Sequence, residues 1–98
     1  MSKFFSLETE PYFSTYYSVI PSPVKYDEVL SSTEKLLYGE LCCIFVIDER
    51  VEISNTYLAA RLNITTRQVQ RALKHLEERN HIRIYNENNI RKIVPKSY

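Results

Sequence analysis

The sequence predicts an α+β fold in which three main helices precede a C-terminal β-hairpin. Apolar residues recur at helical spacing over about 33–46, 55–62 and 66–79. Two strand-like segments, 82–85 and 90–94, follow on either side of Glu87, Asn88 and Asn89, which are residue types typical of turns. At 98 residues with 44% apolar side chains, the chain can bury one modest core. We therefore expect a single domain over residues 1–98.

The first segment of this domain is expected to be extended. Residues 16–26 are rich in Tyr, Val and Ile and contain Pro21 and Pro23, which predicts an N-terminal edge strand followed by an extended arm, with residues 1–15 as an N-terminal arm before it. Ser31 and Glu34 then match a capping box, which predicts a helix from about Thr33 to Val46. Gly39 lies within this helix, where we expect a close packing contact with a neighbouring element.

The middle of the chain has the marks of two helices joined by a tight turn. Residues 51–53 alternate like a short strand, and Ser54 is suited to cap a helix over about 55–62. Asn63 can adopt the left-handed conformation that such a turn requires. Thr65 and Gln68 match a second capping box, and the helix that they open should end near Arg79.

Residues 80–94 predict a helix end followed by a hairpin, which completes the order of elements along the chain. Asn80 can serve as a left-handed helix end, and residues 82–94 predict a β-hairpin. Helix, short strand, helix, turn, helix and hairpin follow one another in a winged helix-turn-helix. The sequence therefore predicts that fold, with the helix-turn-helix over 54–80 and the wing over 82–94.

Charge is distributed unevenly between the two parts of the chain. The net charge is only +1, but residues 1–60 contain four basic and nine acidic residues, a balance of −5, whereas residues 61–98 contain nine basic and three acidic residues, a balance of +6. A one-sided basic surface is typical of a protein that binds phosphates. Because these bases alternate with apolar residues of regular period, we favour a folded basic surface over a disordered tail.

The third helix is the candidate recognition element for duplex DNA. With Val69, Ala72, Leu73 and Leu76 facing the core, its polar side chains lie on the opposite side. No acidic residue occurs from Thr65 to His75. We expect Arg67, Gln70 and Arg71 at base edges and Thr65, Thr66 and Lys74 on phosphates. The alternative is an ordinary solvated helix face.

Arg91 and Lys92 follow the hairpin turn, where a wing could reach an adjacent groove or phosphates. Cations on exposed strands also prevent sheets from aggregating, and the sequence only slightly favours contact with DNA. The complete predicted DNA-binding set is Thr65, Thr66, Arg67, Gln70, Arg71, Lys74, Arg91 and Lys92.

The sequence argues against an enzyme, a metal site or a cofactor. His75 and His81 have no carboxylate at metal-ligand spacing, and no glycine-rich phosphate loop or nucleophile motif is present. We expect His75 on the DNA face or in solvent and His81 near the base of the hairpin. Cys42 and Cys43 are adjacent on a helix, so their side chains diverge by about 100°. We therefore expect neither a disulfide between them nor a zinc ion that they share.

The chain lacks the marks of a membrane or secreted protein. The longest apolar run, 41–47, is too short to span a bilayer, and Glu8, Glu10 and Pro11 follow Phe4 and Phe5 too closely for a secretory signal. We expect a cytoplasmic protein without a membrane partner.

From Tyr17 onward the chain resembles the N-terminal domain of replication initiator, or replisome organiser, proteins of phages and plasmids of Gram-positive bacteria. The similar segments are 17–21, 25–27, 35–40 and 54–59, of which Leu-Leu-Tyr-Gly at 36–39 is the most specific. The resemblance implies a winged-helix domain that binds repeats at a replication origin, often as a dimer. Those proteins are longer, with a linker and a C-terminal domain, and usually have glycine where Asn63 and Asn80 stand here.

Two other functions remain open. The first is a protein-binding winged helix that captures, for example, a host replication or defence protein, and its sign would be an exposed aromatic patch in place of a polar recognition helix. The aromatic residues lie instead in the N-terminal third, at Phe4, Phe5, Tyr12, Phe13, Tyr16 and Tyr17. They are expected either to form a homodimer or partner surface, or to pack as a strand and arm. A transcriptional regulator would have the same DNA-binding residues as an initiator.

Overall fold

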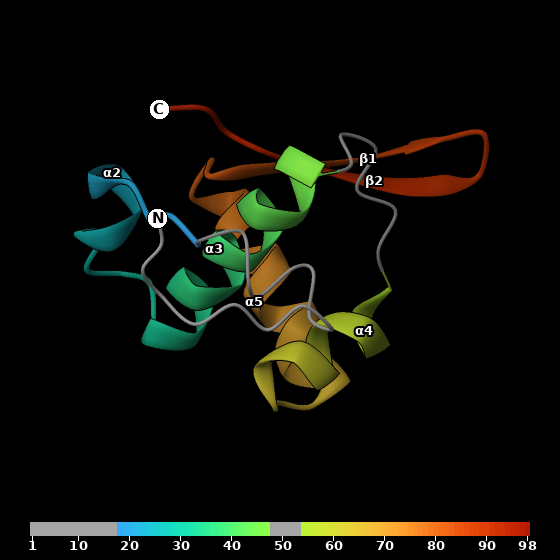
Figure 1. Ribbon diagram of the computed structural model, residues 1–98, viewed down its shortest axis with the longest axis horizontal. Coiled ribbons are helices and arrows are strands. Elements are labelled where there is room, and N and C mark those ends of the chain that lie inside the picture. Colours follow the sequence, from blue (N-terminus) through green and yellow to red (C-terminus); the bar gives the residue numbers. More distant parts are fainter. Residues whose placement is uncertain (1–17, 48–53) are drawn as a thin grey trace, which may run out of the picture.

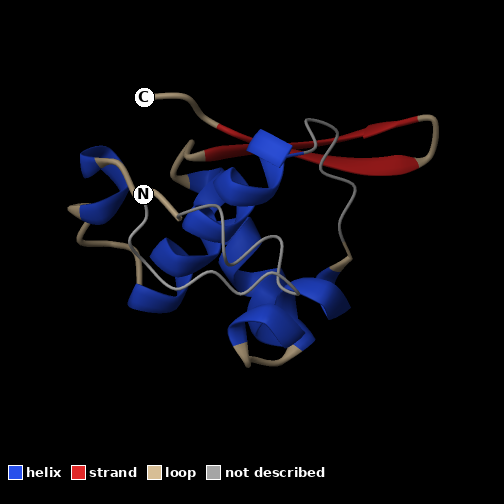
Figure 2. Ribbon diagram, in the orientation of Figure 1, coloured by secondary structure: helices blue, strands red, loops and turns tan. Residues whose placement is uncertain are grey.

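A computed structural model describes residues 18–47 and 54–98, which form an α+β fold (Figures 1 and 2). Its elements are α2 (Ser22–Lys25), α3 (Ser32–Ile47), α4 (Asn55–Leu62), α5 (Thr66–Glu78), β1 (Ile82–Glu87) and β2 (Ile90–Pro95). Helices α3 and α5 pack together, and the hairpin β1–β2 extends away from α2 (Figure 1). The expected arm over 1–15 and the expected short strand over 51–53 lie outside the described residues.

The N-terminal strand predicted over 16–26 is wrong in its described part. Residues 18–20 belong to no regular element, and Ser22–Lys25 form a single helical turn. Pro21 is the N-cap of this turn, and Pro23 lies in its first positions, where a missing backbone N–H costs nothing. The turn buries Val24 completely in the core. The same prolines that exclude a central strand are therefore equally suited to a helix start.

Helix α3 begins where its capping box predicted. The Ser31 hydroxyl accepts a hydrogen bond from the Glu34 amide at 3.1 Å, and the Glu34 carboxylate accepts one from the Ser31 amide at 2.8 Å. Gly39 is buried in this helix, and a Cβ there would lie 3.2 Å from both Ile20 Cγ1 and Ser18 Cβ. The expected close contact is confirmed, and its neighbour is the segment that precedes α2.

The turn between α4 and α5 has the predicted geometry. Ser54 caps α4 by accepting a hydrogen bond from the Tyr57 amide. Asn63 ends the helix in the left-handed conformation, with φ 58° and ψ 47°. Two residues later Thr65 begins α5 with a complete capping box to Gln68. The short connection places α4 against α5 as a helix-turn-helix.

Helix α5 leads directly into the hairpin. Arg79 is its C-cap, and Asn80 is left-handed with φ 64°, which allows the amides of Asn80 and His81 to close the last turn on Glu77 and Leu76. The strands pair antiparallel, with Ile84 opposite Ile93 and Asn86 opposite Arg91. Asn88 and Asn89 both have positive φ, as a two-residue hairpin turn requires.

The core lies between α3, α5 and the base of the hairpin. It includes the fully buried side chains of Leu37, Tyr38, Leu41, Leu58, Val69, Leu76 and Ile93. Helix order, turn and hairpin together make this a winged helix-turn-helix, as predicted. No helix in the described part of the chain combines the length and the apolar character needed to cross a membrane.

Candidate nucleic-acid interface

Helix α5 has one buried apolar face and one exposed polar face. Val69, Ala72, Leu73 and Leu76 are buried, whereas the predicted contact residues Thr66, Arg67, Gln70, Arg71 and Lys74 are all exposed. At about 100° per residue, Arg67, Arg71 and Lys74 lie almost directly opposite the buried stripe, with Gln70 beside them. The structure therefore places the predicted base-reading side chains together on one face.

The cations of this face form no ion pairs among the described residues, although Glu78 lies on the same side of α5 in its last turn. No ion pair joins Arg67, Arg71 or Lys74 to an acidic side chain within residues 18–47 and 54–98. The first turn of α5 also contains no acidic residue, so the partial positive charge of the helix N-terminus adds to that of the side chains. Such a surface attracts anions, and phosphates in particular.

The first turn of α5 is held by Thr65 and Gln68. The Thr65 hydroxyl accepts a hydrogen bond from the Gln68 amide at 3.0 Å, and Gln68 Oε1 accepts one from the Thr65 amide at 2.9 Å. Thr65 is exposed but already serves as a helix cap. Its role at a phosphate stays a prediction, while its structural role is clear.

His75 does not lie on this polar face, contrary to expectation. Its Nδ1 is 2.9 Å from the Glu34 carboxylate at the start of α3, and its side chain is only 30% exposed. On the helix His75 falls between the buried and the exposed stripes. It therefore braces α5 against α3, a contact that helix periodicity alone does not show.

Arg91 and Lys92 point to opposite faces of the wing. Side chains directly opposite each other share a face, so Arg91 lies with Asn86 on the face that carries Ile93, and Lys92 lies with Tyr85 on the outer face. Both are half-buried, and burial lowers the pKa of Arg91. The two residues would thus approach DNA from different sides, which the sequence alone did not reveal.

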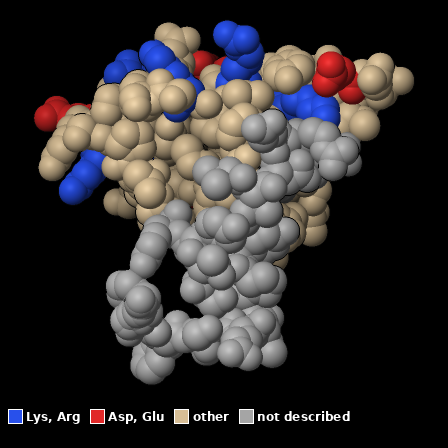
Figure 3. All heavy atoms as spheres, turned by 45° about the horizontal axis from the view of Figure 1, so that its top comes forward, with Lys and Arg blue, Asp and Glu red and all other residues tan. Residues whose placement is uncertain are grey.

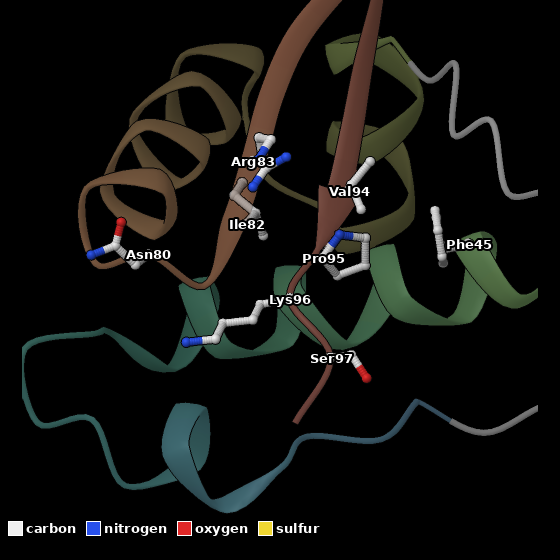
Figure 4. Close-up of a pocket in the computed structure, with 8 residues that line it drawn as sticks. All are labelled: Phe45, Asn80, Ile82, Arg83, Val94, Pro95, Lys96 and Ser97. Carbon is white, nitrogen blue, oxygen red and sulfur yellow. The ribbon is translucent and has the colours of Figure 1, made fainter.

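A shallow groove lies at the base of the hairpin (Figure 4). Its volume is about 590 Å³, and among the described residues no acidic side chain lines it. Arg83 and Lys96 are its cations, and Lys and Arg side chains are spread over the surface that faces the viewer at the top of Figure 3. The full lining is Phe45, Asn80, Ile82, Arg83, Val94, Pro95, Lys96 and Ser97.

Sequence reasoning missed a buried carboxylate at the end of α5. Asp27 follows α2 and accepts hydrogen bonds from Arg79 Nε at 3.0 Å, Arg79 Nη2 at 3.1 Å and His81 Nε2 at 2.8 Å. These bonds, with one from the Val29 amide, hold the pKa of Asp27 well below its usual value. His81 lies near the hairpin base, as predicted. Its partner could not be found from spacing, because the two residues are 54 positions apart.

Comparison with known proteins supports the fold. No protein-family model matches the chain, and no curated protein matches it. One solved structure, described as the N-terminal domain of a DNA binding protein, superposes with a TM-score of 0.72 at 15% sequence identity. The match covers 99% of this chain and 85% of that one. At this identity the likeness establishes a shared fold.

Proposed function

We propose that this protein binds duplex DNA sequence-specifically through α5 and does so without catalysis. The observation that carries the proposal is the exposed face of Arg67, Gln70, Arg71 and Lys74, which lies opposite a fully buried apolar stripe. A helix of this kind fits the major groove. The likeness to an N-terminal domain of a DNA binding protein supports the same interpretation.

The side chains of this face would contact either bases or phosphates, according to their chemistry. Gln70 can bond bidentately to adenine, and Arg67 and Arg71 to guanine, each good pair being worth about 1–3 kcal/mol of discrimination. Lys74, Thr66 and Thr65 would bind phosphates, which set affinity and register. Arg91 and Lys92 would add phosphate contacts from the wing.

Binding of labelled duplexes at increasing salt tests the proposal. With about six phosphate contacts, affinity should fall on the order of 10³-fold between 50 and 200 mM salt. Gln70→Ala with Arg71→Ala should abolish the preference for a selected sequence over a random one. Lys74→Ala should weaken binding to both sequences alike.

Lys25→Ala provides the matched control for the loss of one charge. Lys25 is exposed on α2, an element separate from the helix-turn-helix, and its removal should change affinity little. Binding that is insensitive to salt, or that survives Gln70→Ala with Arg71→Ala unchanged, would overturn the proposal. It would instead favour a winged helix that binds a protein.

We further propose that the DNA target is a phage or plasmid replication origin, as the resemblance to replication initiators implies. Sequencing the fragments that the protein retains from a library of such genomes tests this. Enrichment of repeated sites at origins is expected, whereas enrichment of promoters would indicate a transcriptional regulator. Sedimentation of the full chain and of a variant that lacks residues 1–15 tests the proposed homodimer.

A further inference from the structure

We infer that Asp27 is a positioning residue that fixes the direction of the wing relative to the recognition helix, so that both engage DNA together. The inference rests on the proposed function but concerns a residue outside the proposed DNA-binding face. Asp27 lies between α2 and α3, far along the chain from both elements that it would align.

The Asp27 carboxylate is enclosed and saturated with donors. Its side chain is only 6% exposed, and it accepts hydrogen bonds from Arg79, His81 and the Val29 amide. Arg79 binds it with two nitrogens, a geometry that restricts orientation as well as distance. The guanidinium and the imidazole are therefore held in one fixed arrangement around a single carboxylate.

The two residues that Asp27 binds lie at the two ends of the short junction between α5 and β1. Arg79 is the C-cap of α5, Asn80 reverses the chain in the left-handed conformation, and His81 immediately precedes β1. Asp27 thus binds the C-cap residue that ends α5 and the residue that directly precedes the wing. Rotation of the hairpin about Asn80 would break one of these contacts.

The base of the hairpin is braced from a second side. The His81 carbonyl accepts a hydrogen bond from the Lys96 amide, and the Lys96 carbonyl accepts one from the buried Tyr38 hydroxyl at 2.7 Å. His81 Nδ1 lies 2.5 Å from the Tyr98 hydroxyl, so both imidazole nitrogens are engaged. The imidazole cannot turn without losing its contact with Asp27, in the segment between α2 and α3, or with Tyr98, in the C-terminal segment.

The tip of the hairpin has little other support. Ile82 and Ile93 are buried, but from Tyr85 to Ile90 every side chain is exposed. From Ile82 to Glu87 the strand extends about 17 Å, so a 10° rotation at the base would move the tip by about 3 Å. At Arg91, which lies opposite Asn86, the same rotation would move the chain by about 2 Å, enough to break a hydrogen bond to a phosphate, whose N···O distance is about 3 Å.

A double-mutant cycle tests the inference. The wing variant Arg91→Gln with Lys92→Gln should weaken binding on the order of 30-fold at 150 mM salt, if two phosphate contacts are lost. Asp27→Asn alone should weaken binding by about tenfold and reduce the salt dependence. In the Asp27→Asn background, the wing variant should then weaken binding by less than about threefold, because the misaligned wing no longer contacts phosphate.

The direction in which Asp27→Asn changes DNA affinity distinguishes a positioning role of Asp27 from a simple effect of its charge. Asp27→Asn removes a negative charge, which by itself would tighten binding to DNA. Glu40→Gln is the matched control, because Glu40 forms a similar ion pair with Arg61 at 3.0 Å but joins α3 to α4. It removes the same charge without touching the junction, and the wing variant should retain its full effect in that background.

Three results would overturn the inference. The first is that the wing variant weakens binding equally with and without Asp27. The second is that Asp27→Asn binds DNA as tightly as the unaltered protein. The third is that the wing variant does not weaken binding at all. None of them bears on Gln70 and Arg71, so failure here is distinguishable from failure of the proposed function. If circular dichroism shows that Asp27→Asn does not fold, Arg79→Gln replaces it, since it leaves the bond between Asp27 and His81 in place.

Discussion

Arg79 and Asp27, 52 positions apart, form a two-nitrogen ion pair at the point where α5 ends. The Asp27 carboxylate is enclosed, whereas the Arg79 side chain is 44% exposed. The pair therefore ties the segment after α2 to the surface of the helix-turn-helix. We expect the stability of the fold and the direction of the hairpin both to depend on this contact.

Asp27 should make the fold sensitive to acid. Its pKa in the folded protein lies well below the value of about 3.9 expected in the unfolded chain, so the ionised carboxylate favours the folded state. The stabilisation is complete above about pH 5 and is lost as the pH falls below about 4. Urea unfolding of the protein and of Asp27→Asn should show a difference at pH 7 that shrinks at pH 3. A difference that is constant with pH would contradict the assigned role.

Neighbouring leucines of α3 should respond very differently to truncation. Leu37 is completely buried, whereas Leu36 is 55% exposed. Leu37→Ala should lower the free energy of unfolding by about 2–5 kcal/mol, because it removes contacts and leaves a cavity. Leu36→Ala is the control and should change it by at most about 0.5 kcal/mol. Similar losses for both would mean that the helix faces are assigned wrongly.

The Thr65 cap should contribute measurably to the stability of α5. Thr65→Ala removes the acceptor for the Gln68 amide and should lower the free energy of unfolding by about 0.5–2 kcal/mol. Thr65→Ser keeps the hydroxyl and should be nearly neutral. Chemical denaturation of the three proteins measures the effect, and equal stability of the alanine and serine variants would exclude the capping role.

At the left-handed position that follows α5, replacement by alanine and by glycine should affect stability differently. Asn80 has a φ of 64°, which costs most residues with a Cβ about 1–2 kcal/mol but costs glycine almost nothing. Asn80→Ala should therefore destabilise the fold by about 1 kcal/mol, whereas Asn80→Gly should not destabilise it. Thermal unfolding of both variants checks this order, and the reverse order is incompatible with the turn.

Much of this fold follows from short-range patterns in the chain. The capping boxes at Ser31 and Thr65 and the left-handed turns at Asn63 and Asn80 depend on residues within a few positions of one another. The exposed face of α5 follows equally from helical periodicity. These features were therefore predictable, and the structure confirms them.

Long-range contacts decided the remainder. Residues 21–25 suit a strand arm or a helical turn, and burial of Val24 against the core selects the turn. His75 has a polar side chain that would suit solvent, but the position of α3 gives it Glu34. Asp27 meets Arg79 and His81 only after the helices have packed. Local spacing encodes where helices begin, end and turn, because those interactions join near neighbours. Which charges meet, and in which direction the wing points, depends on groups brought together from distant parts of the chain.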